Sequence, residues 1–136
     1  MSGVLVDSSV LIDLVSRDPR WSAWSRARIA ELRMAGPLWI NQIVYAECRI
    51  AFSRSGSDAL DRQDMLGRQD LPWEAAAMAG EAHAEYRRRG GGREAILPDF
   101  LIGAHAAFAG YPLLTRDPRR VRRAFPALEI IAPEGV

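Results

Sequence analysis

The sequence predicts an α/β fold in which a short central parallel sheet is covered by helices on both faces. Short apolar runs typical of buried strands alternate along the chain with longer segments of helical pattern. Parallel strands need helical, right-handed crossovers to connect them, so this alternation indicates a three-layer α/β/α arrangement. The chain has 136 residues, of which 49% are hydrophobic. We therefore expect one domain, spanning residues 1–136, with a single core.

The first half of the chain contains two strand–helix units. Residues 3–6 form a β-branched run that ends at Asp7, and Ser8 or Ser9 can cap the helix that follows. Asn41 is a suitable cap for the third helix. The expected elements are a strand at 3–6, helices at 10–15 and 21–35, a strand at 38–40 and a helix at 42–53.

The second half repeats the alternation. A basic, glycine-rich loop at 87–93 separates two long helices, and Pro98 with Asp99 opens the second of them. The expected elements are helices at 57–67 and 73–89 with a small strand or turn at 69–71 between them, a helix at 98–110, a strand at 112–115, a helix at 118–125 and a strand at 128–131.

Composition excludes several classes of function. The 18 basic and 17 acidic residues give a net charge of +1, so nucleic-acid binding would depend on local patches. Every basic residue is an arginine, which excludes a P-loop and Schiff-base chemistry because both need a lysine. The single Cys48 forms no internal disulfide and suits a reducing cytoplasm. No apolar stretch approaches the ~20 residues that span a bilayer, so we expect no membrane association.

Three aspartates stand where strands end or helices begin. Asp7 follows the first strand, Asp99 opens the helix at 98–110, and Asp117 follows the strand at 112–115. Parallel strands present their carboxyl ends at one edge of the sheet, where such folds bind ligands, so we expect these carboxylates to converge. Each alone could be a helix cap or, for Asp117, a turn residue.

Glu47 is harder to explain by capping. An apolar stripe is expected on its helix, and position 47 falls inside that stripe. The stripe comprises Ile43, Ala46, Ile50 and Ala51. Because burying an ionised carboxylate is unfavourable, Glu47 needs either an arginine or a cation as its partner.

A cluster of four acids favours a divalent cation. Two carboxylates ~4 Å apart repel by about 4 kcal/mol at an effective dielectric constant of 20, and a cation relieves this repulsion. Oxygen ligands without nearby histidine or cysteine favour Mg²⁺ or Mn²⁺ over zinc. One or two such ions can activate water for in-line displacement at a phosphodiester.

Four segments together resemble PIN-domain nucleases, specifically the VapC-type toxins of toxin–antitoxin pairs. These segments are VLVDSSVLIDL, INQIVYAECRIAF, ILPDFLIGAHAAFAGYPLLTRDPRRV and LEIIAPE, and they cover essentially the whole chain. The resemblance implies a Mg²⁺- or Mn²⁺-dependent endoribonuclease that is homodimeric and is held inactive by a cognate VapB-type antitoxin. The acids that match the family's metal-binding quartet are Asp7, Glu47, Asp99 and Asp117. Ser9 and Thr115 match hydroxyl positions beside the metal.

Two arginine clusters flank these motifs and could contact RNA phosphates. The candidates are Arg87, Arg88, Arg89, Arg93, Arg116, Arg119 and Arg120. A solvated surface or an antitoxin contact would use the same side chains. Two other functions stay open: a PIN nuclease of RNA processing that is not a toxin, and a catalytically silent module that binds RNA or protein.

Four other polar or reactive side chains are interpreted as structural. Asp13 is expected in solvent because helical rotation carries it away from the opening turn of its helix. His83 is expected at the surface, and His105 in the core or an interface. Cys48 has no histidine nearby in the sequence, so we expect a buried thiol rather than a nucleophile.

Overall fold

The predicted alternation of strands and helices is confirmed by the computed structural model, which describes residues 3–52, 65–92 and 96–135. Within these ranges the elements are β1 (Val4–Val6), α1 (Ser8–Ser16), α2 (Ser22–Ala35), β2 (Leu38–Ile40), α3 (Gln42–Phe52), β3 (Gly67–Arg68), α4 (Trp73–Arg88), α5 (Pro98–Ala109), β4 (Leu113–Leu114), α6 (Arg119–Ala124) and β5 (Ile130–Ile131).

The strands form one parallel sheet in the order β3-β2-β1-β4-β5. β1 lies at its centre, with Val4 opposite Leu38 of β2 and Leu5 opposite Leu113 of β4. Along the chain, β2 and β3 are added on one side of β1, and β4 and β5 are then added on the other side. In open α/β folds, ligands bind beside the carboxyl ends of the strands where the strand order reverses in this way.

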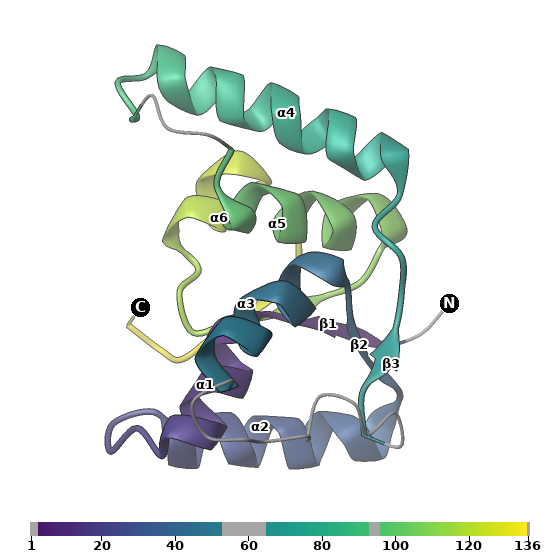
Figure 1. Cartoon of the computed structure of the whole chain (residues 1–136), viewed down its shortest axis with the longest axis vertical. Helices are drawn as coiled ribbons and strands as arrows, with labels where there is room; N and C mark the ends of the chain where they lie inside the picture. The colour runs from purple at the N-terminus through teal and green to yellow at the C-terminus, as the bar shows by residue number, and fades with distance from the viewer. Residues whose placement is uncertain (1–2, 53–64, 93–95, 136) are drawn as a thin grey trace.

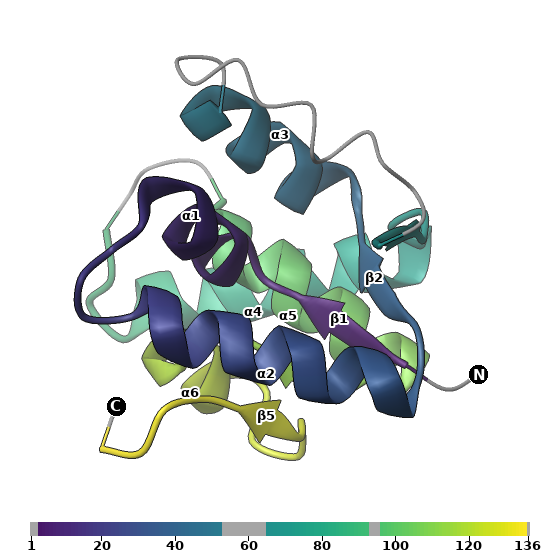
Figure 2. The same cartoon turned by 90° about the horizontal axis from the view of Figure 1, so that it is seen from below.

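Helices cover both faces of the sheet, as predicted. Figure 1 shows α2 on one side and α4, α5 and α6 on the other, with α4 lying outside α5. The view from below in Figure 2 agrees, because α2 lies in front of the sheet and α4 and α5 lie behind it. α1 contacts both α2 and α3, while α5 contacts α4, α6 and also α3. The three-layer α/β/α arrangement is confirmed.

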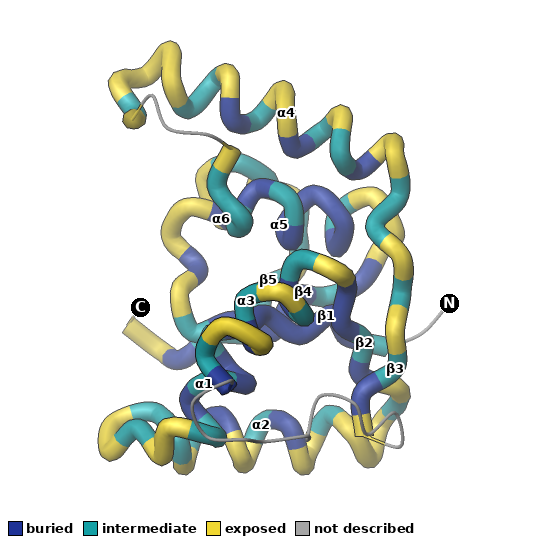
Figure 3. Tube along the Cα trace, in the orientation of Figure 1, coloured by how far each residue is buried: buried dark blue, intermediate teal, exposed yellow. Residues whose placement is uncertain are grey.

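The main core is centred on the strands. Leu5, Val6 and Leu114 are fully buried, because a parallel sheet with helices on both faces leaves no solvated side. Figure 3 shows burial concentrated along the strands and the inward sides of the helices. A smaller cluster joins α4 to α5, where Ala75 and Ala79 of α4 face Phe100 of α5. No described helix is long and apolar enough to cross a membrane.

The fold differs from the prediction at β3. This strand lies at residues 67–68 rather than 69–71, so Gly67 belongs to a strand and does not end a helix. Gly67 pairs with Trp39 of β2, and a Cβ atom at Gly67 would lie 2.5 Å from Cζ3 of that indole. The absence of a side chain therefore lets the ring lie against β3. Residues 57–64 of the predicted helix, and Ser53 at the end of another, lie outside the described residues.

We predict that Gly67→Ala lowers the free energy of unfolding by about 1–3 kcal/mol, because the added methyl group displaces the Trp39 indole. Gly80→Ala is the matched control, since Gly80 is an exposed position of α4 where an added Cβ meets nothing within 4 Å. It should raise stability by about 0.5–1 kcal/mol through helix propensity. Urea unfolding of both variants measures these changes, and equal stability of the two would contradict the close approach of Trp39.

Candidate functional site

Asp7 follows β1 directly and lies at the carboxyl edge of the sheet with 9% of its surface exposed. Its Oδ2 atom accepts hydrogen bonds from Ser9 Oγ at 2.6 Å and from Thr115 Oγ1 at 2.8 Å. Thr115 reaches Asp7 because Val6 pairs with Leu114, which makes neighbours of the residues that follow the two strands. The Asp7 side chain makes no capping hydrogen bond to α1, so helix capping does not explain it.

The electrostatic surroundings of Asp7 disfavour its ionised form. Burial raises the pKa of this carboxyl above its usual 3.8, and the charge of Asp99 adds to the increase. The hydrogen bonds from Ser9 and Thr115 act in the opposite direction, because they stabilise the carboxylate. An additional positive charge would stabilise the ionised form at this position.

Glu47 faces the same edge from α3. Ser8 Oγ, in the first turn of α1, donates to Glu47 Oε1 at 2.7 Å. Partial burial raises the pKa of Glu47, and the charges of Asp7 and Asp99 raise it further, while the Ser8 hydrogen bond lowers it. Since both charges act on Glu47, the three carboxylates lie within electrostatic reach of one another. The local sequence indicates Ser8 only as a helix cap, because a contact with Glu47, 39 residues away, leaves no local signal.

The apolar stripe predicted around Glu47 is wrong in its position. The buried residues of α3 are Val44, Cys48 and Phe52. Their spacing of four residues sets the core-facing side, which leaves Ala46 exposed and Ile50 76% exposed. Ile43 and Ala51 are partly buried, as is Glu47. Glu47 therefore lies at the border of the core and not within it.

Asp99 lies in the first turn of α5, as predicted, two residues after the N-cap Leu97. Its Oδ2 atom accepts a hydrogen bond from Arg120 Nη1 at 3.0 Å, which joins the start of α5 to α6. Its charge acts on both Asp7 and Glu47. Asp99 therefore belongs to the same acidic group, with one described arginine at its side.

Asp117 lies apart from these three acids. Its side chain is 68% exposed, and Arg116 Nη1 lies 3.7 Å from its Oδ1 atom. The acidic charges that raise the pKa of Asp7 and Glu47 do not include Asp117. Its backbone N–H donates to Thr115 Oγ1 at 3.1 Å, so the main chain at Asp117 contacts the site while the carboxylate faces solvent.

Two expectations about other side chains are wrong. Asp13 is only 2% exposed, and its Oδ2 atom pairs with Arg116 Nε at 2.8 Å. The rotation that carries Asp13 away from the opening turn carries it against α2, where Ser25 Oγ donates to it at 3.2 Å. His83 is buried rather than at the surface, and its ring meets the Phe100 ring edge-on with centroids 5.5 Å apart.

Cys48 and His105 are buried, as expected. Burial raises the pKa of the Cys48 thiol to about 12, so the thiol stays protonated and is no nucleophile. His105 Nδ1 lies 3.0 Å from Asn41 Nδ2, and burial lowers the pKa of this histidine. Asn41 Oδ1 also accepts the Val44 N–H at 3.0 Å, which confirms the predicted cap of α3. Both Cys48 and His105 therefore have structural roles.

The arginines of the two predicted clusters take different positions. The exposed ones are Arg87, Arg88 and Arg89 at the end of α4 and Arg119 and Arg120 at the start of α6. The guanidinium of Arg120 lies 5.7 Å from the centroid of Tyr86 on α4, which brings the two clusters together beside Asp99. Arg116 instead pairs with buried Asp13. Arg93 lies outside the described residues.

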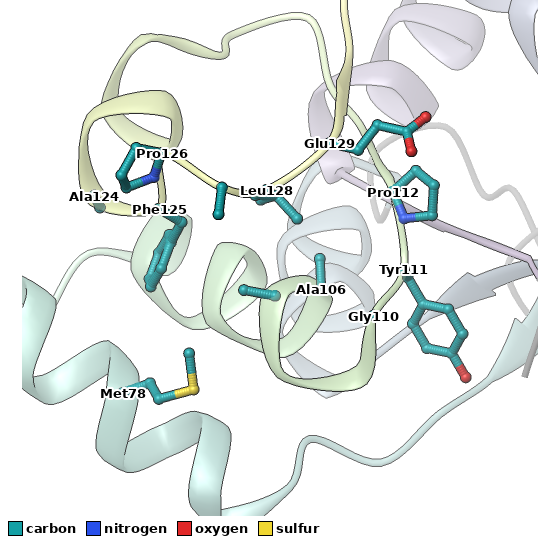
Figure 4. Close-up of a pocket in the computed structure, with 12 residues that line it drawn as sticks. Met78, Ala106, Gly110, Tyr111, Pro112, Ala124, Phe125, Pro126, Leu128 and Glu129 are labelled. Atoms are coloured by element: carbon teal, nitrogen blue, oxygen red, sulfur yellow. The ribbon is translucent and has the colours of Figure 1, made fainter.

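A pocket with a mostly apolar lining lies elsewhere in the described part of the chain. It has a volume of about 460 Å³ and is lined by residues of α4, α5 and α6 and of the loops that precede β4 and β5. Figure 4 shows Tyr111 and Pro112 on one side, Phe125 and Pro126 on the other, and Leu128 between them. These loops lead into the amino ends of the strands, so the pocket is at the opposite edge from Asp7.

The arrangement of the chain matches that of a known family. Residues 4–126 match the model of the PIN domain, which accounts for nearly the whole sequence. The chain belongs to the PIN domain family. A comparison with curated protein sequences finds no significant match.

Solved structures share this PIN fold. VapBC2 from Rickettsia felis, bound to a DNA fragment from its promoter, is 18% identical with a TM-score of 0.74, covering 97% of this chain and 99% of that one. DNA-bound VapBC from Salmonella typhimurium is 22% identical with a TM-score of 0.72, covering 97% and 98%. FitAcB from Neisseria gonorrhoeae is 18% identical with a TM-score of 0.69, covering 98% and 99%. At these identities the likeness shows the fold.

The acidic edge of this PIN domain suits a hard divalent cation. Asp7 and Glu47 receive hydrogen bonds from hydroxyl groups, and none of the described arginines forms an ion pair with either. Carboxylate and hydroxyl oxygens are the donors that Mg²⁺ and Mn²⁺ prefer. Among the described residues, no three acidic, histidine or cysteine side chains are grouped closely enough to hold one metal ion. Binding by all three acids therefore requires side-chain movement, for which Asp99 is suited because it is partly exposed.

We predict that Asp7→Asn raises the free energy of unfolding at pH 7 in the presence of EDTA. The folded-state pKa of Asp7 is raised, so its effect on stability is unfavourable once the pH exceeds 3.8 and the unfolded chain ionises. This loss grows until the pH passes the folded-state pKa, at about 1.4 kcal/mol for each unit of pKa difference.

Urea unfolding from pH 4 to pH 8 measures this difference. The gain from Asp7→Asn should be smallest near pH 4 and largest near pH 7. Asp70→Asn, at an exposed position on the loop after β3, is the control for loss of one negative charge. A gain that is the same at both pH values would contradict the raised pKa of Asp7.

Proposed function

We propose that this PIN domain is a Mg²⁺- or Mn²⁺-dependent endoribonuclease. The observation that carries the proposal is that Asp7, Glu47 and Asp99, which belong to three separate parts of the fold, act on one another electrostatically near the carboxyl edge of the sheet. Hydroxyl groups stabilise the carboxylates of Asp7 and Glu47, and none of the described arginines forms an ion pair with either. PIN domains are generally nucleases, and hydrolysis of a phosphodiester is the chemistry for which such a group is suited.

The three carboxylates would hold one or two cations, with Asp117 as a fourth acid that approaches only if its side chain turns inward. Bound Mg²⁺ or Mn²⁺ lowers the pKa of a coordinated water and neutralises charge that develops on the phosphate. Ser9 and Thr115 hold Asp7 in one orientation, and Ser8 does the same for Glu47. Water would add to phosphorus as the P–O bond to the leaving oxygen breaks. The water would lose a proton to solvent and the leaving oxygen would gain one, so no side chain would become covalently attached to RNA.

RNA as the substrate is supported by a group of exposed arginines beside Asp99, which we call the arginine face. It comprises Arg87, Arg88, Arg89 and Arg120. Arg120 lies between Asp99 and the ring of Tyr86, and the exposed arginines at the end of α4 continue this face. Guanidinium groups bind phosphates through paired, charge-assisted hydrogen bonds. With a net charge of only +1, the chain depends on this local face and not on an overall field to bind RNA.

We further propose that the protein acts as a cytoplasmic homodimeric toxin that a VapB-type antitoxin neutralises. Support comes from the solved structures that share its fold, since VapBC from Salmonella typhimurium and a toxin–antitoxin complex from Klebsiella pneumoniae are among them. An antitoxin that covers the acidic edge and the arginine face would block both the cation and the RNA. The test is whether expression arrests bacterial growth and whether co-expression of a small open reading frame, if one adjoins the gene, relieves the arrest.

We predict that Asp99→Asn reduces RNA cleavage on the order of 100-fold or more, because it removes one charge from the cation site while keeping the side-chain shape. Purified protein is incubated with total bacterial RNA and Mg²⁺ or Mn²⁺, and new RNA ends are mapped by sequencing. EDTA should abolish the same ends. Asp70→Asn, an exposed acid outside the site, should cleave like the wild type.

Each outcome of this assay is decisive. Discrete ends that need both the cation and Asp99 identify a site-specific endoribonuclease. Full cleavage by Asp99→Asn refutes the site assignment. The absence of new ends under any condition favours a silent binding module instead.

We also predict that Mg²⁺ or Mn²⁺ raises the melting temperature of the wild type by several degrees. A cation at 100 times its Kd adds about 2.7 kcal/mol to stability because it binds only the folded chain. Glu47→Gln should show a smaller increase, since it removes a carboxylate that Ser8 holds at the edge. Differential scanning fluorimetry with Ca²⁺-free buffers measures the shift, and equal shifts for the two proteins would exclude Glu47 from the site.

A further inference from the structure

The buried ion pair between Asp13 and Arg116 lies next to the acidic edge but outside it. Asp13 on α1 is 2% exposed and accepts hydrogen bonds from Ser25 Oγ of α2 and from Arg116 Nε. Arg116 follows β4 by two residues and is 26% exposed at its side chain. The pair therefore ties the segment after β4 to the first two helices, across 103 residues of sequence.

The main chain of this segment sets the direction of the hydroxyl groups around Asp7. The Arg116 N–H donates to Ser9 Oγ at 3.1 Å, and Ser9 Oγ donates to Asp7 Oδ2 at 2.6 Å. A hydroxyl has a single proton to donate, so an N–H that occupies its lone pair leaves that proton for the carboxylate. Thr115 is arranged in the same way, because its Oγ1 accepts the Asp117 N–H and donates to Asp7 Oδ2.

We propose that Asp13 and Arg116 are positioning residues that hold residues 115–117 against α1 and thereby fix the Asp7 carboxylate for its cation. Neither side chain contacts Asp7. Both act through Ser9 and Thr115, whose hydroxyl groups depend on where residues 115–117 lie. This inference extends the proposed function, since the cation is part of that proposal.

An ion pair suits this role better than a neutral contact. Charge-assisted hydrogen bonds are short and directional, and the planar guanidinium of Arg116 also reaches Asp117 Oδ1 at 3.7 Å through Nη1. Removing one partner of a buried pair leaves the other charge without compensation. The position of residues 115–117 is therefore sensitive to either side chain. This role also explains an acid in the interior of α1 that no capping or metal-binding function requires.

The first test needs no cation. Amide hydrogen exchange, followed by NMR, compares the wild type with Asp13→Asn. Arg116 is unchanged in this variant, so its backbone amide can serve as the probe. We expect the Arg116 and Asp117 amides to exchange at least tenfold faster, while the Ala79 amide in α4 is unchanged. Unchanged exchange at Arg116 and Asp117 would overturn the proposal.

The second test measures the affinity for Mn²⁺ by electron paramagnetic resonance. Residues that orient metal ligands typically change affinity by 10- to 100-fold, so we expect Asp13→Asn and Arg116→Gln each to weaken binding about tenfold. The double variant should bind no more weakly than the weaker single variant, because the two residues act as one pair. Effects that add in full would show that the residues act separately, against the proposal.

Controls separate positioning from other roles. Arg28→Gln breaks the exposed Arg28–Glu31 pair on α2 and should keep wild-type affinity. If Arg116 served only to contact RNA, Arg116→Gln would weaken RNA binding and leave Mn²⁺ affinity unchanged, which would overturn the proposal. Should Asp13→Asn fail to fold, Ser25→Ala tests the same acid more gently and should show a smaller loss of affinity in the same direction.

Failure of the proposed function gives a different result. A wild type that binds no Mn²⁺ and cuts no RNA refutes the nuclease assignment. The exchange of the Arg116 and Asp117 amides then still decides whether the pair holds residues 115–117 against α1.

Discussion

The placement of a carboxylate at the buried end of the central strand is the constraint on which the rest of the acidic edge depends. Asp7 is almost fully covered, and its ionised form is stabilised by hydroxyl groups rather than by a described arginine. Those hydroxyl groups come from α1 and from the end of β4, so β1 and β4 must be paired in register before they can meet. Glu47 and Asp99 approach from α3 and α5, and their charges add to the same unfavourable field. The fold thus holds three carboxylates that repel one another, and a bound cation would relieve this repulsion.

Much of the fold could be predicted because its signals are local and repeated. Apolar runs separated by helical segments determine the parallel sheet, and Asn41 caps α3 as its sequence context indicates. β3 was misplaced by two residues, since a strand of two residues has no periodicity to detect. The packing of Gly67 against Trp39 is a tertiary contact that local pattern cannot reveal.

The same holds for the site: residues marked by a local pattern could be predicted, whereas residues whose surroundings depend on tertiary contacts could not. Asp7 and Asp99 stand out because strand ends and helix starts can be recognised locally. Asp13 was misjudged for a physical reason: helical rotation tells which way a side chain leaves its helix, and not what lies there. In this fold α2 and Arg116 cover that side of α1, which turns an expected surface acid into the buried half of an ion pair.

The pairing of the first strand with the fourth has a consequence for synthesis. Asp7 and Thr115 are separated by 108 residues, and Leu5 joins Leu113 across the sheet. On a translating ribosome the N-terminal strand therefore emerges long before its partner. The hydrogen bond from Thr115 to Asp7 cannot form until residue 115 has left the exit tunnel. Pairing of strands so far apart in the sequence is slow, because a long loop must close first. The sheet order thus delays the complete acidic edge while the nascent chain is still attached to a particle made largely of RNA.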